Sequence, residues 1–354
     1  MVRQTRSSFL RLATAGMIAA PYLRSEAAAA EAPLSFEFHS AFWENLHHRL
    51  YMQAQAYEAV RRGDHLNPTD SAWSALASDS WQEYQRLSQP ERKQWERALQ
   101  IYANGLADMD LLDAPMASID AAVSHIDDRA DVPKSSILHP ATIQALTIAA
   151  PVYRATLWHA DDAANRRWIA AVAPHVSDHS APLTSRLEGW YRSPWPVGPY
   201  RVDVTRYANW AGCYTNTDPI HIIMSSRDFV NNRTHAAVPN SRRTALEMVF
   251  HEASHTVVTP GYGTVGTAIE NGATELRKPE PDGLWHAVIF YTAGRAVGDE
   301  FPAAQYQMFA DAVDIYTHGW EPYRKALIDH WQPYLDGKRP FDEALKDVVA
   351  AASA

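Results

Sequence analysis

Cysteine is almost missing from this chain of 354 residues, which contains only Cys213. An intramolecular disulfide is therefore impossible, and metal sites built from several thiolates are excluded as well. Any metal ion would have to be bound by imidazole and carboxylate groups. The sequence supplies both, with 16 histidines and 41 aspartates and glutamates.

Basic residues are in the minority, because 32 Lys and Arg stand against 41 Asp and Glu and the formal net charge is −9 at pH 7. The acidic residues are spread along the chain rather than gathered at one end. Proteins that bind nucleic acid need a basic surface that contacts phosphates. A nucleic-acid partner is therefore not expected, whereas the apolar content of 46% predicts a sizeable core.

Long apolar runs are also absent, since no segment after the first 30 residues has about 18 uninterrupted apolar residues, the length that spans a bilayer. The first 30 residues have the order of an export signal, with Arg3, Arg6 and Arg11 followed by an apolar run to Leu23 and alanines at 27–30. The sequence therefore predicts a signal peptide over 1–30 that is cleaved near Ala30. We expect a periplasmic or secreted product without stable membrane insertion.

Residues 31–195 have the periodicity of helices. Apolar side chains recur at mostly four-residue spacing over 36–54, which predicts one long first helix there. Further helices are predicted up to about residue 191, including separate ones over about 161–174 and 181–191. We expect this part of the chain to be a helical N-terminal region with short polar turns.

Residues 196–354 begin differently, after a Pro- and Gly-rich stretch at 193–199 that breaks helices. Three short segments rich in β-branched residues predict an antiparallel meander, at 200–207, 210–215 and 219–225. Helices are predicted again from Thr244 onwards. The whole pattern predicts an α+β, mostly helical fold, with a small antiparallel sheet in the second region.

A metal-binding pattern lies inside the helix that is predicted to begin at Thr244 and to end near Val258. His251 and His255 are four residues apart, so their imidazoles lie on one helix face and can bind one ion. Glu252 lies about 100° further round the helix, beside the ion rather than under it. Its carboxylate is therefore available as a base.

On these five residues the chain resembles the HExxH zinc metallopeptidases, the zincin superfamily. The resemblance covers about residues 200–300 and implies a zincin-like core, a bound Zn²⁺ and peptidase-type hydrolysis. It also implies that an edge strand of the sheet binds extended substrate above the active-site helix. By its position before the motif, the segment 220–225 is expected to be that strand.

A third metal ligand has to come from a later element. His286 lies in a strongly apolar predicted helix, where a buried imidazole needs a polar partner, and we expect it to complete the site. The alternatives are Glu275, which follows His255 by 20 residues, and Glu270. A third histidine ligand would leave the site more positive than a carboxylate would, and a bound water would become more acidic.

The expected function is that of an exported zinc-dependent hydrolase, foremost a metallopeptidase that acts on a peptide or another amide. Zinc lowers the pKa of bound water from about 15.7 to about 7, and Glu252 would take the water proton and pass it to the leaving amine. The oxyanion donor stays open between Tyr262 and His221, whereas Tyr291 is expected to point away. The alternative functions are a zinc hydrolase of a non-peptide amide and a non-enzymatic binding or scaffold protein.

Four other histidines receive structural interpretations. His47 and His48 are adjacent, so their rings diverge by about 100° on a helix and an exposed pair is expected. His175 and His179 are interpreted as part of a polar helix end. The lone Cys213 is expected to be a small buried residue in a strand, and the tryptophans are expected in the core.

Overall fold

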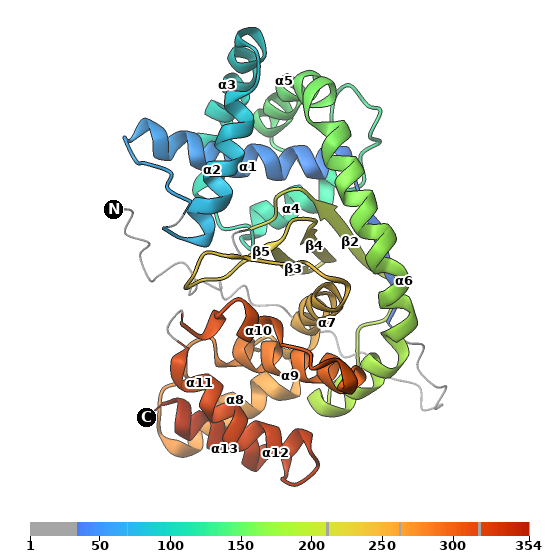
Figure 1. Cartoon of the computed structure of the whole chain (residues 1–354), viewed down its shortest axis with the longest axis vertical. Helices are drawn as coiled ribbons and strands as arrows, with labels where there is room; N and C mark the ends of the chain where they lie inside the picture. Colours follow the sequence, from blue (N-terminus) through green and yellow to red (C-terminus); the bar gives the residue numbers. More distant parts are fainter. Residues whose placement is uncertain (1–33, 69, 210–211, 262, 318–319, 354) are drawn as a thin grey trace.

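The computed structural model describes residues 34–353, apart from positions 69, 210–211, 262 and 318–319. These residues form a mostly helical α+β fold, as predicted, in which a four-stranded sheet lies between two layers of helices (Figure 1). The predicted signal peptide over 1–30 lies outside the described residues. Among those described, no helix combines the length and the apolar character that crossing a bilayer requires.

The first layer consists of helices from the N-terminal half of the chain. They are α1 (Phe42–Arg61), α2 (Ala72–Gln85), α3 (Gln89–Ala103), α4 (Ala114–Val123) and α5 (Pro140–Thr156). Helix α6 (Trp158–Tyr191) then runs along one side of the molecule from this layer to the other (Figure 1). It is one continuous helix with Pro174 and Pro182 inside it, so the prediction of two separate helices over this stretch is wrong.

The second layer contains the remaining helices. They are α7 (Arg242–Val258), α8 (Thr264–Leu276), α9 (Leu284–Glu300), α10 (Phe309–Ala312), α11 (Glu321–Ala326), α12 (Gln332–Leu335) and α13 (Phe341–Ala352). A π-helical segment at Leu327–Trp331 joins α11 to α12. This layer therefore carries the helix with the HExxH pattern.

The four-stranded sheet is mixed, which corrects the predicted antiparallel meander. Its order is β1-β2-β4-β3, formed by β1 (Phe36–His39), β2 (Tyr200–Thr205), β4 (Ile220–Ser225) and β3 (Cys213–Thr217). Strands β1, β2 and β4 are parallel, and β3 is antiparallel to β4. Strand β4 is buried on both faces and so takes a central position. A separate antiparallel hairpin follows, formed by β5 (Phe229–Val230) and β6 (Ala237–Val238).

The first helix begins later than predicted, because Phe36–His39 is a strand. Phe36 and Phe38 are two residues apart and therefore lie on one face of β1, where both pack against the core of the second layer. The four-residue spacing holds from Phe42 onwards, and α1 begins there. The change of apolar spacing from two to four was the signal for a strand followed by a helix.

Alternate residues of the sheet face different cores. Ile222 and Met224 of β4 pack with side chains of α6, α7 and α9, whereas Ile223 packs with α1, α3 and α5. The sheet therefore separates two apolar cores, and each residue on its strands belongs to one of them.

Helix α7 lies between the sheet and α9, and nearly all of its side chains are buried. Ser241 caps its first turn by accepting a hydrogen bond from the backbone N–H of Thr244 at 3.3 Å. It ends at Val258, as predicted, before the helix-breaking Pro260 and Gly261. Polar side chains on a helix buried on all sides require polar partners. Glu252, His251 and Glu247 contact such partners on β3, α9 and α10, respectively.

Candidate metal centre

The three histidines predicted to bind metal lie together between α7 and α9. We call His251, His255 and His286 the histidine centre, and their ligand nitrogens all lie within 4.8 Å of one another. The Nε2 atoms of His251 and His286 are 3.2 Å apart. Two nitrogens on one tetrahedral zinc ion would be separated by about 3.4 Å, since each Zn–N bond is about 2.1 Å long. The spacing fits a shared ion.

Aromatic side chains hold these imidazoles in place. The ring of His286 stacks on Trp285 with centroids 5.1 Å apart, and the edge of Trp320 meets it at 5.6 Å. Phe290 lies 4.0 Å from the His251 ring centroid and 4.8 Å from that of His286. The Nδ1 of His251 is buried without a hydrogen-bond partner, so ring packing orients this imidazole.

Burial keeps the histidine centre uncharged. It lowers the pKa of His255 to about 4 and the pKa values of His251 and His286 well below their usual range, with a further lowering by neighbouring histidines. Neutral imidazole is the form that binds metal. The His255 side chain is 15% exposed and that of His251 is 2% exposed, so solvent reaches the centre on the side of His255.

Glu252 lies beside the histidine centre and is held by β3. Its Oε2 accepts a hydrogen bond from Thr215 Oγ1 at 2.7 Å, and its oxygens lie 4.0 Å from His251 Nε2 and 3.8 Å from His255 Nε2. Burial raises the pKa of Glu252 to about 7, against the opposing effect of hydrogen bonds from Cys213 and Thr215. A buried carboxyl group with a pKa near neutrality is suited to general acid–base chemistry.

The edge strand beside α7 is β3, and β4 lies inside the sheet, so the prediction that 220–225 forms this edge is wrong. Strand β3 pairs with β4 on one side and has no strand on the other among the described residues. Cys213 is buried, as predicted, and its thiol contacts Glu252. The role of Thr215 was missed, although its position two residues after Cys213 places both on one face of a strand.

The two glutamates considered as third ligands lie away from the histidine centre. Glu275 is 60% exposed on α8 and pairs with Lys346, with 2.6 Å between the Lys346 Nζ and a carboxylate oxygen. Glu270 is exposed on the same helix. Within the part of the chain that the structure describes, His286 is the residue that joins His251 and His255.

Neither His221 nor Tyr291 extends this site. His221 faces the opposite side of the sheet from α7, where its Nε2 lies 2.8 Å from Asp203 Oδ2. Tyr291 donates its hydroxyl proton to Gln332 at 2.7 Å, in agreement with the expectation that it points away. Tyr262 lies outside the described residues.

The prediction of an exposed His47–His48 pair is wrong, because both side chains are completely buried. Helix α1 is packed between the sheet and other helices, so its flanks are covered as well as its apolar face. His175 and His179 lie within the long helix α6 rather than at a helix end, and both pack against Phe301.

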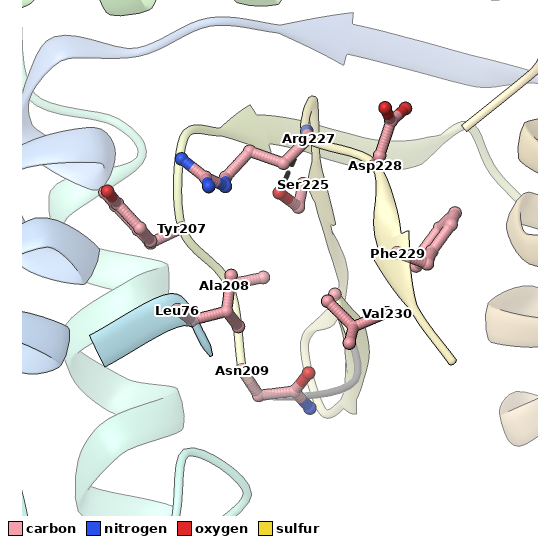
Figure 2. A pocket seen from close by; sticks show the side chains of 10 residues that line it. Leu76, Tyr207, Ala208, Asn209, Ser225, Arg227, Asp228, Phe229 and Val230 are labelled. Atoms are coloured by element: carbon pink, nitrogen blue, oxygen red, sulfur yellow. Dashed lines mark hydrogen bonds between the residues drawn. The ribbon is translucent and has the colours of Figure 1, made fainter. Parts of the chain in front are cut away.

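A pocket elsewhere in the fold is separate from the histidine centre. Figure 2 shows it between α2, the loop after β2 and β5. Arg227 in its wall already pairs with Asp79 at 2.5 Å and lies over the Tyr207 ring. Its charge is therefore compensated within the protein, and none of the three centre histidines lines it.

Comparison of the chain with family models, with curated proteins and with solved structures gave no match. The chemistry of the site itself is therefore the guide to its function.

Proposed function

We propose that the protein is an exported zinc-dependent hydrolase, a metallopeptidase with a zincin-like core, in which the histidine centre holds Zn²⁺ and Glu252 is the general base. The observation that carries this proposal is the approach of three neutral imidazoles to one point beside a buried carboxyl group. Export is proposed from the order of residues 1–30.

The donor set suits zinc. Three imidazoles are a ligand set found in catalytic zinc sites, where a fourth position stays open for water. Zinc bound there would supply an acidified water, with a pKa near 7 instead of about 15.7. The partial exposure of His255 supports access of water and substrate from that side.

The protein groups around this position have separate tasks. A Glu252 carboxylate oxygen accepts the proton of the attacking water and then donates it to the nitrogen of the leaving amine. Thr215 is a positioning residue, since its hydroxyl hydrogen bond fixes the Oε2 of Glu252. Trp285 and Phe290 cover the imidazoles and exclude water from their apolar side.

An extended peptide is the proposed substrate. Strand β3 pairs with β4 on one side and with no strand on the other among the described residues, and the unpaired backbone groups of an edge strand can pair with an added strand. The same strand carries Thr215, which contacts Glu252. A peptide paired with β3 would therefore run beside the base.

The test measures zinc content and peptide hydrolysis of the full chain and of two variants. His255→Ala should lose about one zinc per chain and all hydrolysis, because two imidazoles hold zinc poorly. Glu252→Gln should keep its zinc and lose hydrolysis. Glu275→Gln is the matched control, and it should keep both. Full hydrolysis by Glu252→Gln, or an unchanged zinc content in His255→Ala, would overturn the proposal.

A further inference from the structure

A second group of metal-type side chains lies on the opposite face of the sheet, between α1, α4 and β3. We call Glu44, His48 and Asp120 the carboxylate cluster. Glu44 and His48 are one turn apart on α1, and Asp120 lies on α4. Their potential ligand atoms all lie within 4.8 Å of one another, and all three side chains have no solvent exposure.

Several polar atoms of this cluster have no hydrogen-bond partner. They are both carboxylate oxygens of Glu44, the Oδ1 of Asp120 and, beside them, the Nε2 of His47. Leaving a buried polar group unpaired costs about 1–3 kcal/mol, and more if the group is charged. Four such atoms at one completely buried place call for a partner, either a proton shared between the two carboxyl groups or a bound cation.

The neighbouring side chains do not neutralise the two carboxylates. The ion-pair contacts of the cluster are made by histidines, at 3.4 Å from His47 Nε2 to Asp120 Oδ1 and at 3.4 Å from His48 Nδ1 to Glu44 Oε1. Arg201, on the nearby strand β2, is paired with Asp203. A cation between the carboxylates would supply the missing charge.

The same groups are oriented as metal ligands are. The Nδ1 of His48 lies 2.9 Å from the backbone carbonyl oxygen of Glu44 and 3.4 Å from its Oε1, so this imidazole is held against the Glu44 carboxylate. Asp120 Oδ2 accepts from the Tyr214 hydroxyl at 2.8 Å and from Asn216 Nδ2 at 3.0 Å, so its Oδ1 faces the cluster. The Tyr214 oxygen also lies 2.7 Å from His48 Nε2, at the edge of the site.

We propose that Glu44, His48 and Asp120 form a second, structural site for a divalent transition-metal cation such as Zn²⁺ or Mn²⁺. Two carboxylates balance the charge of a divalent ion, and an imidazole with carboxylates is a donor set for such metals. The complete burial of the ligands leaves no route for a substrate. The ion joins α1 to α4 and, through Tyr214 and Asn216, fixes the rear face of β3.

The alternative partner is a proton. Burial and the nearby Asp120 raise the pKa of Glu44 well above its usual range, so a protonated Glu44 could donate to Asp120 without any metal. The two states respond differently to Glu44→Gln. An amide replaces a protonated carboxyl group with little cost, whereas it removes the charge that a cation needs.

The experiment measures metal per chain in the full-length protein produced with added Zn²⁺. Wild type should carry about two zinc ions per chain, and His255→Ala should carry about one. The double variant with His255→Ala and Glu44→Gln should carry none. The melting temperature of that double variant should fall and should no longer respond to a chelator. Glu247→Gln is the matched control, because Glu247 is equally buried but hydrogen-bonded; it should keep both ions.

The His255→Ala variant alone also decides the question, without any change in the carboxylate cluster. A His255→Ala protein that retains no Zn²⁺, and takes up no Mn²⁺ when Mn²⁺ replaces it, would overturn the second site. So would a Glu44→Gln variant with unchanged metal content and an unchanged or higher melting temperature. Failure of the proposed hydrolase is a separate result, because it concerns hydrolysis and the zinc that is lost with His255.

Discussion

The histidine centre and the carboxylate cluster lie on opposite faces of one sheet and differ in charge and access. The first consists of three neutral imidazoles and is reached by solvent at His255. The second contains two carboxylates and has no exposed side chain. A divalent ion among neutral ligands keeps its full charge to polarise a water, whereas two carboxylates cancel it. Charge balance and exposure, rather than histidine content, separate a site suited to reaction from one suited to stability.

The largest expected effect is at the third ligand of the histidine centre. His286→Ala should abolish hydrolysis and remove about one zinc per chain, because two imidazoles remain on α7. Zinc analysis and peptide cleavage measure this directly. Glu270→Gln changes the exposed glutamate that was the other candidate on α8, and it should have no effect. Equal zinc loss in both variants would contradict the assignment of His286.

Metal removal from the carboxylate cluster should destabilise the whole fold. In a His255→Ala background, free Zn²⁺ at about 1,000 times its dissociation constant stabilises the native state by about 4 kcal/mol. A strong chelator should therefore lower the urea midpoint of this variant. The same chelator should leave a His255→Ala, Asp120→Asn variant unchanged. If the chelator lowers the urea midpoints of both variants equally, the carboxylate cluster does not hold the stabilising metal ion.

Glu247 is a useful contrast to Glu44 of the carboxylate cluster. It is equally buried, but it accepts hydrogen bonds from Tyr306 Oη at 2.5 Å and Phe309 N at 2.9 Å. Burial nevertheless raises its pKa to about 8. The unfolded chain releases this proton near pH 4.5, so the folded state holds more protons between about pH 4.5 and 8, and stability falls as pH rises through this range. Glu247→Gln should remove that fall and stabilise the protein at pH 8 by about 4 kcal/mol.

Urea midpoints at pH 5 and pH 8 test this prediction. The exposed Glu275 provides the control, since Glu275→Gln should keep the wild-type dependence on pH. If Glu247→Gln loses as much stability between pH 5 and 8 as wild type does, the proton bound by Glu247 is not the cause of that loss.

The smallest expected effect concerns the hydrogen bond that positions the base. Thr215→Val keeps the shape of the side chain and removes the 2.7 Å bond to Glu252. The loss of one such bond is worth about 1.5 kcal/mol, so kcat should fall about tenfold while zinc is retained. The matched change Thr217→Val lies two residues further along β3 and should leave kcat unaltered. Loss of zinc from Thr215→Val would show that the threonine supports the metal centre instead.

The parts of the site that could be predicted depend on local geometry. His251, Glu252 and His255 lie within five residues of one helix, and helical spacing fixes their relation. His286 was expected because a histidine in an apolar helix needs a partner. The order of the strands could not be derived, since β4 lies between β2 and β3 through contacts that residue spacing does not encode.

The carboxylate cluster was missed for a related reason. Glu44 and His48 have the same four-residue spacing as the motif histidines, but the adjacency of His47 and His48 predicted an exposed pair. Asp120 comes from a helix far along the chain, so no spacing indicates that it joins them. Burial on every side of α1 was also unpredictable, because it depends on how the layers stack.

The alternation of side chains along β3 makes both sites depend on one strand alignment. Cys213 and Thr215 face Glu252, while Tyr214 and Asn216 face Asp120. Sliding the strand by one position against β4 would exchange these two sets. An inserted or deleted residue in this strand would therefore remove the β3 contacts of Glu252 and of Asp120 together, so substitutions should be tolerated there far better than changes in length.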